Sequence, residues 1–68
     1  MNDPVYKKVE LVGTSAASIE DAISHAVEKA AQSGEKIDWF EVVEIRGSVR
    51  DGKVGNYQLV LKVGSRLP

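Results

Sequence analysis

The single tryptophan of this sequence, Trp39, lies in the segment IDWFEVVEIRG at residues 37–47. β-Branched and aromatic residues dominate the segment, which is therefore predicted to form a strand whose successive side chains point to opposite faces. Trp39 and its neighbour Phe40 consequently cannot both enter the same one-sided core. An aromatic side chain on an uncovered sheet face either packs into a subunit interface or stacks on a flat ligand. The interface is the simpler interpretation of Trp39, and the sequence leaves the stacking interpretation open.

Gln58 and Arg46 are the two polar residues that could assist such a ligand site. The Gln58 amide carries donors and an acceptor, which suits the edge of an imide or pyrimidine ring, although a solvated strand residue is the simpler interpretation. The planar guanidinium of Arg46 could bind a phosphate. It could equally form an ion pair with Glu44, two positions away on the same strand face, within one subunit or between subunits, and we favour this ion pair.

The sequence shows no catalytic or metal-binding pattern. His25, the only histidine, falls outside the apolar stripe of the predicted helix and is expected to be solvated or to lie in an interface. No serine has a visible base partner other than His25, and no G-x-S-x-G segment is present. The segment GTSAAS at residues 13–18 matches neither G-x-G-x-x-G nor the Walker A pattern. With no cysteine, one histidine and scattered carboxylates, we expect no metal site and no enzymatic activity.

One helix is predicted between two β-rich regions. Residues 5–15 form the first predicted strand. Ser18 is the expected N-cap of the helix, with Asp21 at the spacing of a capping box, and Gly34 is placed to end the helix as a C′ glycine. The apolar positions follow the helical period and are mostly small, which suits close packing on a sheet: Ile19, Ala22, Ile23, Ala26, Val27 and Ala30.

Two long strands follow the helix, at residues 38–50 and 53–67. The Asp51-Gly52 dipeptide between them is typical of a two-residue hairpin turn of type I′. The element order is therefore β-α-β-β. The two strands joined through the helix are expected to be parallel, with a right-handed crossover, and the third strand antiparallel to the second.

The hairpin turn also predicts which side chains share a face. A two-residue turn pairs Arg50 with Lys53 and, further along the strands, places Trp39 opposite Gly64. Trp39 is then on the face without the helix, whereas Phe40 is on the helix-covered face and enters the core. Gly64 has no side chain and is expected to leave one indole face uncovered.

The same register distributes the remaining hairpin residues between the two faces. The open face is expected to carry Glu41 opposite Lys62, together with Val43, Ile45, Gln58 and Val60. The helix-covered face is expected to carry Phe40, Val42, Glu44, Tyr57, Leu59, Leu61 and Val63. A β-bulge would swap the faces beyond it, and Gly47 and Gly55 are the candidate positions.

The predicted strands are longer than the helix that must cover them. About 12 strand residues extend ~40 Å, whereas about 16 helical residues extend only ~24 Å. The uncovered apolar side chains are therefore expected to form a subunit interface. Trp39 and Gln58 lie roughly 20 Å apart along the hairpin, so a site that contains both requires symmetry-related chains.

Length and composition are those of one soluble domain over residues 1–68. At this size only roughly 60% of the surface of the unfolded chain is buried on folding, so oligomerisation is the expected aid to stability. Nine Lys and Arg residues against ten Asp and Glu residues give a formal charge of −1. The basic residues are scattered, which argues against a nucleic-acid partner. No apolar run reaches the ~20 residues of a membrane span and no secretory signal is recognised, so a cytoplasmic location is expected.

Three segments together resemble the bacterial dodecins, which are small flavin-binding proteins: VYKKVELVGTS, DWFEVVEIRGSV and GKVGNYQLVLKVG. The resemblance extends over residues 5–67. It implies an α+β subunit in which a three-stranded antiparallel sheet of order 1-3-2 wraps partly round one helix, and a hollow homododecamer. It further implies flavin pairs stacked between symmetry-related copies of Trp39, with Gln58 bonded to the ring and Arg46 as a further cofactor-binding residue.

The function implied by this resemblance is storage, buffering and photoprotection of flavin without turnover. FMN is the expected ligand, with FAD, riboflavin and lumichrome as alternatives. Two other functions remain open: an oligomeric scaffold whose flavin site is unoccupied, and a flavin-dependent oxidoreductase. Ser65 replaces an aromatic residue that the family often carries, and Ile19 stands where many members have an aromatic. Neither departure concerns Trp39 or Gln58.

Overall fold

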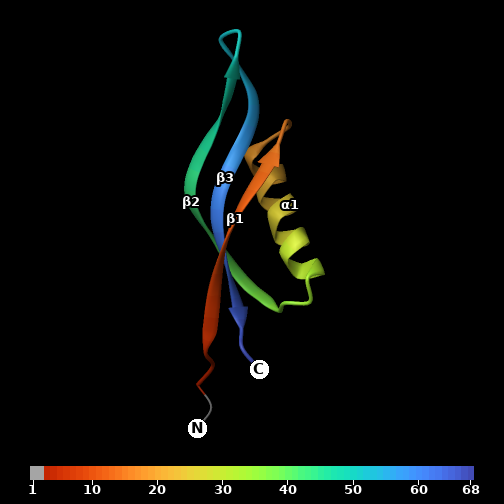
Figure 1. Cartoon of the computed structure of the whole chain (residues 1–68), viewed down its shortest axis with the longest axis vertical. Helices are drawn as coiled ribbons and strands as arrows, with labels where there is room; N and C mark the ends of the chain where they lie inside the picture. Colours follow the sequence, from red (N-terminus) through yellow and green to blue (C-terminus); the bar gives the residue numbers. More distant parts are fainter. Residues whose placement is uncertain (1–2) are drawn as a thin grey trace.

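The computed structural model describes residues 3–68 and contains one helix and one sheet. The elements are β1 (Tyr6–Ser15), α1 (Ile19–Gln32), β2 (Ile37–Arg50) and β3 (Lys53–Arg66). The sheet has the order β1-β3-β2, and β3 is antiparallel to both neighbours (Figure 1). Strands β1 and β2 therefore run parallel to each other. These observations confirm the predicted α+β subunit with β-α-β-β order.

The helix begins and ends where the sequence predicts. The Ser18 side chain accepts a hydrogen bond from the Asp21 backbone N–H at 3.0 Å, which caps the helix N-terminus. Gly34 follows the C-cap with a φ of +93°, a conformation that favours glycine. On the sheet side, a Cβ on Gly13 of β1 would lie 2.3 Å from the Ala22 carbonyl oxygen. The helix backbone therefore lies directly on β1 because Gly13 has no side chain.

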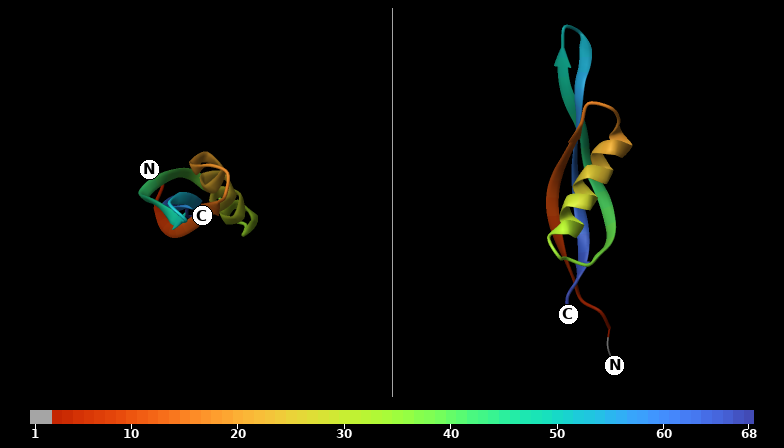
Figure 2. Two further views of the ribbon diagram at one scale, coloured as in Figure 1. Left: turned by 90° about the horizontal axis from the view of Figure 1, so that it is seen from above. Right: turned by 90° about the vertical axis from the view of Figure 1, so that its right-hand side faces the viewer.

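The core lies between α1 and the centre of the sheet (Figure 2). Its fully or nearly buried members are Ala22, Ala26, Leu59, Leu61 and Val63. Half-buried side chains complete it: Leu11, Ile19, Ile23, Val27, Ala30, Ile37 and Tyr57. The six positions of the predicted apolar helix stripe all belong to this core, which confirms the face that α1 turns to the sheet.

Phe40 does not enter this core, and the sequence-based prediction for it is wrong within one subunit. Phe40 is paired with Val63, as expected, and so lies on the helix side of the sheet. It is nevertheless 49% exposed. The reason is that α1 lies mainly over β1 and β3 and has only marginal contact with β2. Ile37 alone among the helix-side residues of β2 packs against the core, whereas Phe40, Val42 and Ile45 remain largely exposed.

The hairpin turn is of the predicted type, since Asp51 and Gly52 both have positive φ, at 54° and 75°. The predicted register also holds for Trp39, which is opposite Gly64, and for Arg50, which is opposite Lys53. Before Trp39 an irregularity at Asp38 pairs Ile37 with Ser65.

Between Trp39 and Arg50 the register is shifted by one residue. A bulge at Val43 leaves this residue without a partner and pairs Glu44 with Val60 instead of Leu59. A compensating irregularity at Gly55 restores the original register before the turn. The predicted bulge position at Gly55 is thus confirmed, whereas Gly47 is regularly paired.

Because of this shift, side chains in the middle of β2 lie on the faces opposite to those predicted from the sequence. Glu44 now points to the open face, and Ile45, paired with the buried Leu59, points to the helix side. Arg46 moves with Glu44 to the open face. The two bulges together exchange the faces of this segment only, as expected for a one-residue change of register.

Ser65 is a buried polar residue near the end of β3. Its hydroxyl donates to Glu35 Oε2 at 2.5 Å, and Glu35 forms an ion pair with Lys7 at 2.9 Å. The Ser65 hydrogen bond and then Lys7 lower the pKa of Glu35. An apolar hollow of about 220 Å³ lies beside Ser65, between the end of α1 and the sheet, and is lined in part by Val9 and Ile37.

The hairpin extends well beyond the end of the helix (Figure 1). The Cα radius of gyration is 14.2 Å, whereas a compact domain of this length would have about 11 Å. Apolar side chains along β2 and β3 are 40% to 73% exposed: Val42, Val43, Ile45, Val49 and Val54. An apolar surface of this kind marks an interaction interface. Among the residues described, no helix is long and apolar enough to cross a membrane.

Candidate ligand-binding site

Trp39 lies flat on the open face of the sheet, directly over Gly64. A Cβ on Gly64 would lie 2.3, 2.3 and 2.4 Å from three consecutive atoms of the indole six-membered ring, Cε2, Cζ2 and Cη2. Nearly equal distances to three consecutive atoms place the face of this ring, rather than its edge, over the glycine. The prediction that Gly64 leaves an indole face uncovered is therefore wrong: the ring covers the glycine itself. Trp39 remains 38% exposed.

Tyr6 borders the indole on the β1 side. The two ring centroids are 5.0 Å apart, and the planes meet at 67°, an edge-to-face arrangement. The guanidinium carbon of Arg66 lies 5.9 Å from the Tyr6 ring centroid, within the range of a cation–π contact. Sequence reasoning missed this role of Tyr6, because the contact joins two strands that are not adjacent in the sheet.

A charged pair lies next to the indole on the same face. Glu41 is opposite Lys62, as predicted, but its carboxylate accepts a hydrogen bond from Lys8 of β1 at 2.7 Å. Lys8 is paired with Gly64, and its side chain extends across β3 to Glu41 of β2. The Lys8 hydrogen bond is the main reason that the pKa of Glu41 is lowered, with smaller contributions from the Trp39 N–H and Lys62.

Arg46 and Gln58 form the polar part of the open face. The bulge at Val43 makes them direct cross-strand partners, and the Arg46 Nε–H donates to Gln58 Oε1 at 3.1 Å. Within residues 3–68 of one subunit, no ion pair joins Arg46 to Glu44, and an ion pair between subunits stays a prediction. Since an arginine Nε–H can only donate, its partner must be the amide oxygen. The Gln58 NH₂ group then remains as the donor that this residue can offer to a ligand.

One subunit brings Arg46 and Gln58 together but leaves Trp39 apart from them. Gly64, beneath the indole, and Gln58 both belong to β3 and point to the same face. The six-residue separation corresponds to roughly 20 Å along an extended strand. A small planar ligand therefore cannot contact Trp39 and Gln58 of the same chain, and a site containing both residues requires a second copy.

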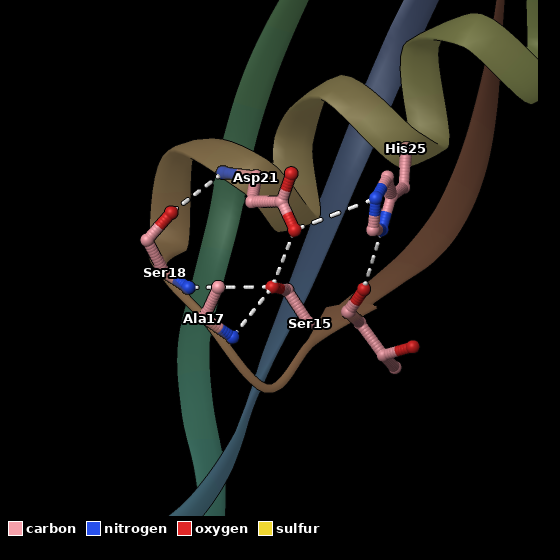
Figure 3. A network of polar contacts seen from close by, with 6 residues as sticks. Ser15, Ala17, Ser18, Asp21 and His25 are labelled. Carbon is pink, nitrogen blue, oxygen red and sulfur yellow. Dashed lines mark hydrogen bonds and ion pairs between the residues drawn. The ribbon is translucent and has the colours of Figure 1, made fainter.

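A second polar network joins the end of β1 to the first turns of α1 (Figure 3). The Ser15 hydroxyl donates to Asp21 Oδ2 at 2.7 Å, and His25 Nε2 lies 3.4 Å from the same oxygen. His25 Nδ1 is bonded to the Thr14 carbonyl oxygen at 3.0 Å, so Nδ1 carries the proton. Ser15 also accepts hydrogen bonds from the backbone N–H groups of Ala17 and Ser18.

This network does not have the geometry of a catalytic triad. In a triad the serine is bonded to the histidine, whereas Ser15 and His25 here meet only through Asp21. The contacts instead fix the β1–α1 connection and the helix N-terminus. Within residues 3–68, no group of three or more His, Cys, Asp or Glu side chains is placed to hold a metal ion.

Fold and site together define a small β-α-β-β protein with a partly exposed tryptophan that lies flat on one face of its sheet. The dodecin family model matches residues 5–68, and the chain belongs to the dodecin family. It is 54% identical to the dodecin of Thermus thermophilus over 63 residues, 93% of this chain and 91% of that relative.

Two solved structures show the same subunit. The dodecin of Streptomyces coelicolor is 43% identical, with a TM-score of 0.92 over all of this chain and 97% of the other. A variant of the Thermus thermophilus dodecin with a tryptophan replaced by phenylalanine is 50% identical, with a TM-score of 0.90 over 97% and 98% of the two chains. The fold of that relative therefore tolerates a phenylalanine in place of a tryptophan.

Proposed function

We propose that this protein binds flavins in sites shared between the subunits of a homo-oligomer, and that it stores, buffers and photoprotects them. The observation that carries the proposal is the arrangement of Trp39. One face of its indole lies on Gly64, and the residue remains partly exposed on an otherwise open sheet face. An aromatic ring supported on one side is a platform for a flat ligand on the other, and membership of the dodecin family favours a flavin as that ligand.

The polar end of the open face supplies the complementary recognition. A flavin ring has carbonyl acceptors at its pyrimidine end, and the Gln58 NH₂ group is the donor that the Arg46 contact leaves available. The remaining N–H groups of Arg46 suit the phosphate of FMN, which would make FMN the preferred ligand over riboflavin and lumichrome. FAD also carries phosphate and is a further candidate.

The separation of Trp39 and Gln58 supports a site built from several chains. We infer that a flavin pair stacks between Trp39 side chains of two subunits while Gln58 binds the ring edge, in the homododecamer that the family resemblance implies. The exposed apolar residues of the hairpin provide a surface for this association. Offset stacking contributes about 0.5–1.5 kcal/mol per aromatic pair beyond the buried area.

Photoprotection follows from the contact between indole and flavin. An electron-rich indole in van der Waals contact can transfer one electron to the excited flavin, and return of that electron restores both ground states. The cycle consumes no co-substrate and leaves the flavin unchanged. We therefore propose a binding role without turnover, in the cytoplasm, with no nucleic-acid or membrane partner.

Titration of FMN with the purified protein tests this function. We expect quenching of flavin fluorescence, co-elution of flavin with the oligomer, and an oligomer mass by light scattering that is independent of flavin. The matched variants are Trp39→Phe, which keeps an aromatic ring, and Trp39→Ala, which removes it. Absence of bound FMN in the wild type would favour the scaffold function, and steady NADH consumption by the flavin-loaded protein would favour the oxidoreductase.

A further inference from the structure

Tyr6 of β1 and Gly64 of β3 both lie against the Trp39 indole. We propose that Tyr6 is a positioning residue, which together with Gly64 holds the indole flat on the sheet in the orientation that a planar ligand requires. We call the group formed by Tyr6, Glu41, Gly64 and Arg66 the indole seat. The link to flavin rests on the function proposed above, whereas the effect of the seat on Trp39 itself does not.

Gly64 provides the floor of the indole seat. A Cβ at this position would approach three indole ring atoms to 2.3–2.4 Å, far inside van der Waals contact. The clash involves the middle of a rigid ring rather than the end of a flexible side chain, so the whole indole would have to leave. Since Gly64 does not have a positive φ, its requirement for glycine here is steric and comes from Trp39.

Tyr6 provides the wall of the seat on the β1 side. Contact with Gly64 alone sets the distance between the indole and the sheet, but it leaves rotation of the Trp39 side chain over the sheet possible. The Tyr6 ring stands at 67° to the indole at a centroid distance of 5.0 Å and blocks rotation toward β1. Arg66, its cross-strand partner, lies over the Tyr6 ring and supports it in turn.

Glu41 lies beside Trp39 on the same face of the sheet, and the hydrogen bond from Lys8 at 2.7 Å holds its carboxylate there. The six-membered ring of the indole lies over Gly64 of β3.

Tyr6 acts through Trp39 and is not itself a stacking surface for a ligand lying on the indole. A ligand parallel to the indole would be steeply inclined to the Tyr6 ring, because the two rings are far from parallel. The predicted effect of Tyr6 is therefore on the orientation of the platform.

The test uses the full-length protein and the fact that Trp39 is its only tryptophan. The variants are Tyr6→Leu, which removes the ring, and Tyr6→Phe, which keeps it. The readouts are the long-wavelength tryptophan band in near-ultraviolet circular dichroism, measured without ligand, and the affinity for FMN. We expect Tyr6→Leu to weaken the band and to reduce FMN affinity about two- to tenfold, the range for one edge-to-face aromatic pair. Tyr6→Phe is expected to restore both.

Gly64→Ala is the second test, with Gly55→Ala as its matched control on the same strand. At Gly55 a Cβ meets only the rotatable Ser48 hydroxyl at 2.8 Å, away from the indole. We expect Gly64→Ala to abolish the tryptophan band and to reduce the affinity for FMN by more than tenfold, on the order of a complete loss of stacking. Gly55→Ala should retain the wild-type band and affinity.

The two readouts test the positioning role of Tyr6 and the proposed flavin function independently. A wild-type band and affinity in Tyr6→Leu would overturn the positioning role, as would weakened FMN binding with an unchanged band, since Tyr6 would then contact the ligand directly. If the wild type fails to bind FMN, the proposed function fails, while the circular dichroism of the Tyr6 variants still tests the seat. If Gly64→Ala does not assemble in light scattering, the Tyr6→Leu and Tyr6→Phe pair carries the test.

Discussion

Trp39 and Gln58 lie on the same face of the same hairpin, yet the protein fixes their orientations by different means. The indole is positioned by packing: it lies on Gly64, which has no side chain, and contacts the ring of Tyr6. The Gln58 amide is held by one hydrogen bond from Arg46, which a bulge brings opposite to it. Packing thus fixes the plane of the aromatic platform, and hydrogen bonding fixes the donor direction of the polar group. Mutations near Trp39 should therefore change the orientation of the indole, whereas mutations near Gln58 should change the hydrogen-bond donor that the amide offers.

The largest effect is expected from Trp39→Ala. Loss of the stacking platform should weaken FMN binding by about 2 kcal/mol or more, which is a decrease in affinity of at least roughly 30-fold, as for a central aromatic contact residue. Light scattering should show an unchanged oligomer mass if the indole serves the ligand rather than the interface. Collapse to smaller species would show instead that Trp39 is mainly an interface residue, and unchanged FMN affinity would remove its stacking role.

Gln58→Glu should separate the polar end from the aromatic end. The new carboxylate would still accept from Arg46, and more strongly, but it would lack the NH₂ donor. We expect affinity to fall by about 1–2 kcal/mol, or roughly tenfold, with an unchanged tryptophan circular dichroism band. Riboflavin is the suitable probe, since it carries no phosphate that the added charge could repel. Equal or tighter riboflavin binding would contradict the donor role of Gln58.

Arg46→Lys tests whether the hydrogen bond to Gln58 matters beyond charge. Lysine keeps the positive charge but lacks the planar Nε–H geometry that orients the amide. We expect a loss of about 0.5–1 kcal/mol in riboflavin binding, only part of the net value of a hydrogen bond from a charged donor, because the lysine ammonium can still donate to Gln58. Arg46→Met, which also loses the charge, is the control. A larger loss for FMN than for riboflavin in Arg46→Met alone would indicate a separate phosphate contact.

The smallest effect concerns pH and should appear only at the aromatic end. The pKa of Glu41 is lowered, chiefly by the hydrogen bond from Lys8, so this carboxylate stabilises the fold above its ordinary pKa. That contribution is lost as the pH falls through the lowered folded-state value. We expect Trp39 fluorescence to change in this acidic range, and Lys8→Met to move the midpoint upward toward the ordinary carboxyl range. An unchanged midpoint in Lys8→Met would disprove the assigned cause.

The register at Trp39 and at Arg50 could be predicted from the sequence because a two-residue turn leaves little freedom. The Asp51-Gly52 turn determines which residues face each other until a bulge occurs, and so Trp39 opposite Gly64 was correct. The bulge at Val43 could not be predicted, since valine fits a regular strand equally well. The bond between Arg46 and Gln58 depends on this bulge and was missed for the same reason.

Two other features depend on tertiary placement that a local pattern does not contain. The helix stripe was predicted correctly, but the pattern does not say which strands α1 covers, and Phe40 was wrongly placed in the core. The contact of Tyr6 with Trp39 requires the strand order β1-β3-β2 and a glycine at position 64, over which the indole can lie. An aromatic residue at the start of the first strand was the available signal, and it becomes informative only once the pairing of β1 with β3 is known.

The part of the hairpin that extends beyond α1 has a consequence for how the protein folds in solution. Its apolar side chains find no cover within their own chain, and a chain of this size is marginally stable by itself. In the proposed homo-oligomer, folding and association form one mass-action equilibrium, in which dilution favours unfolded monomers. The melting temperature should rise with protein concentration, and a cell that makes more of this protein would obtain more stable subunits as well as more of them.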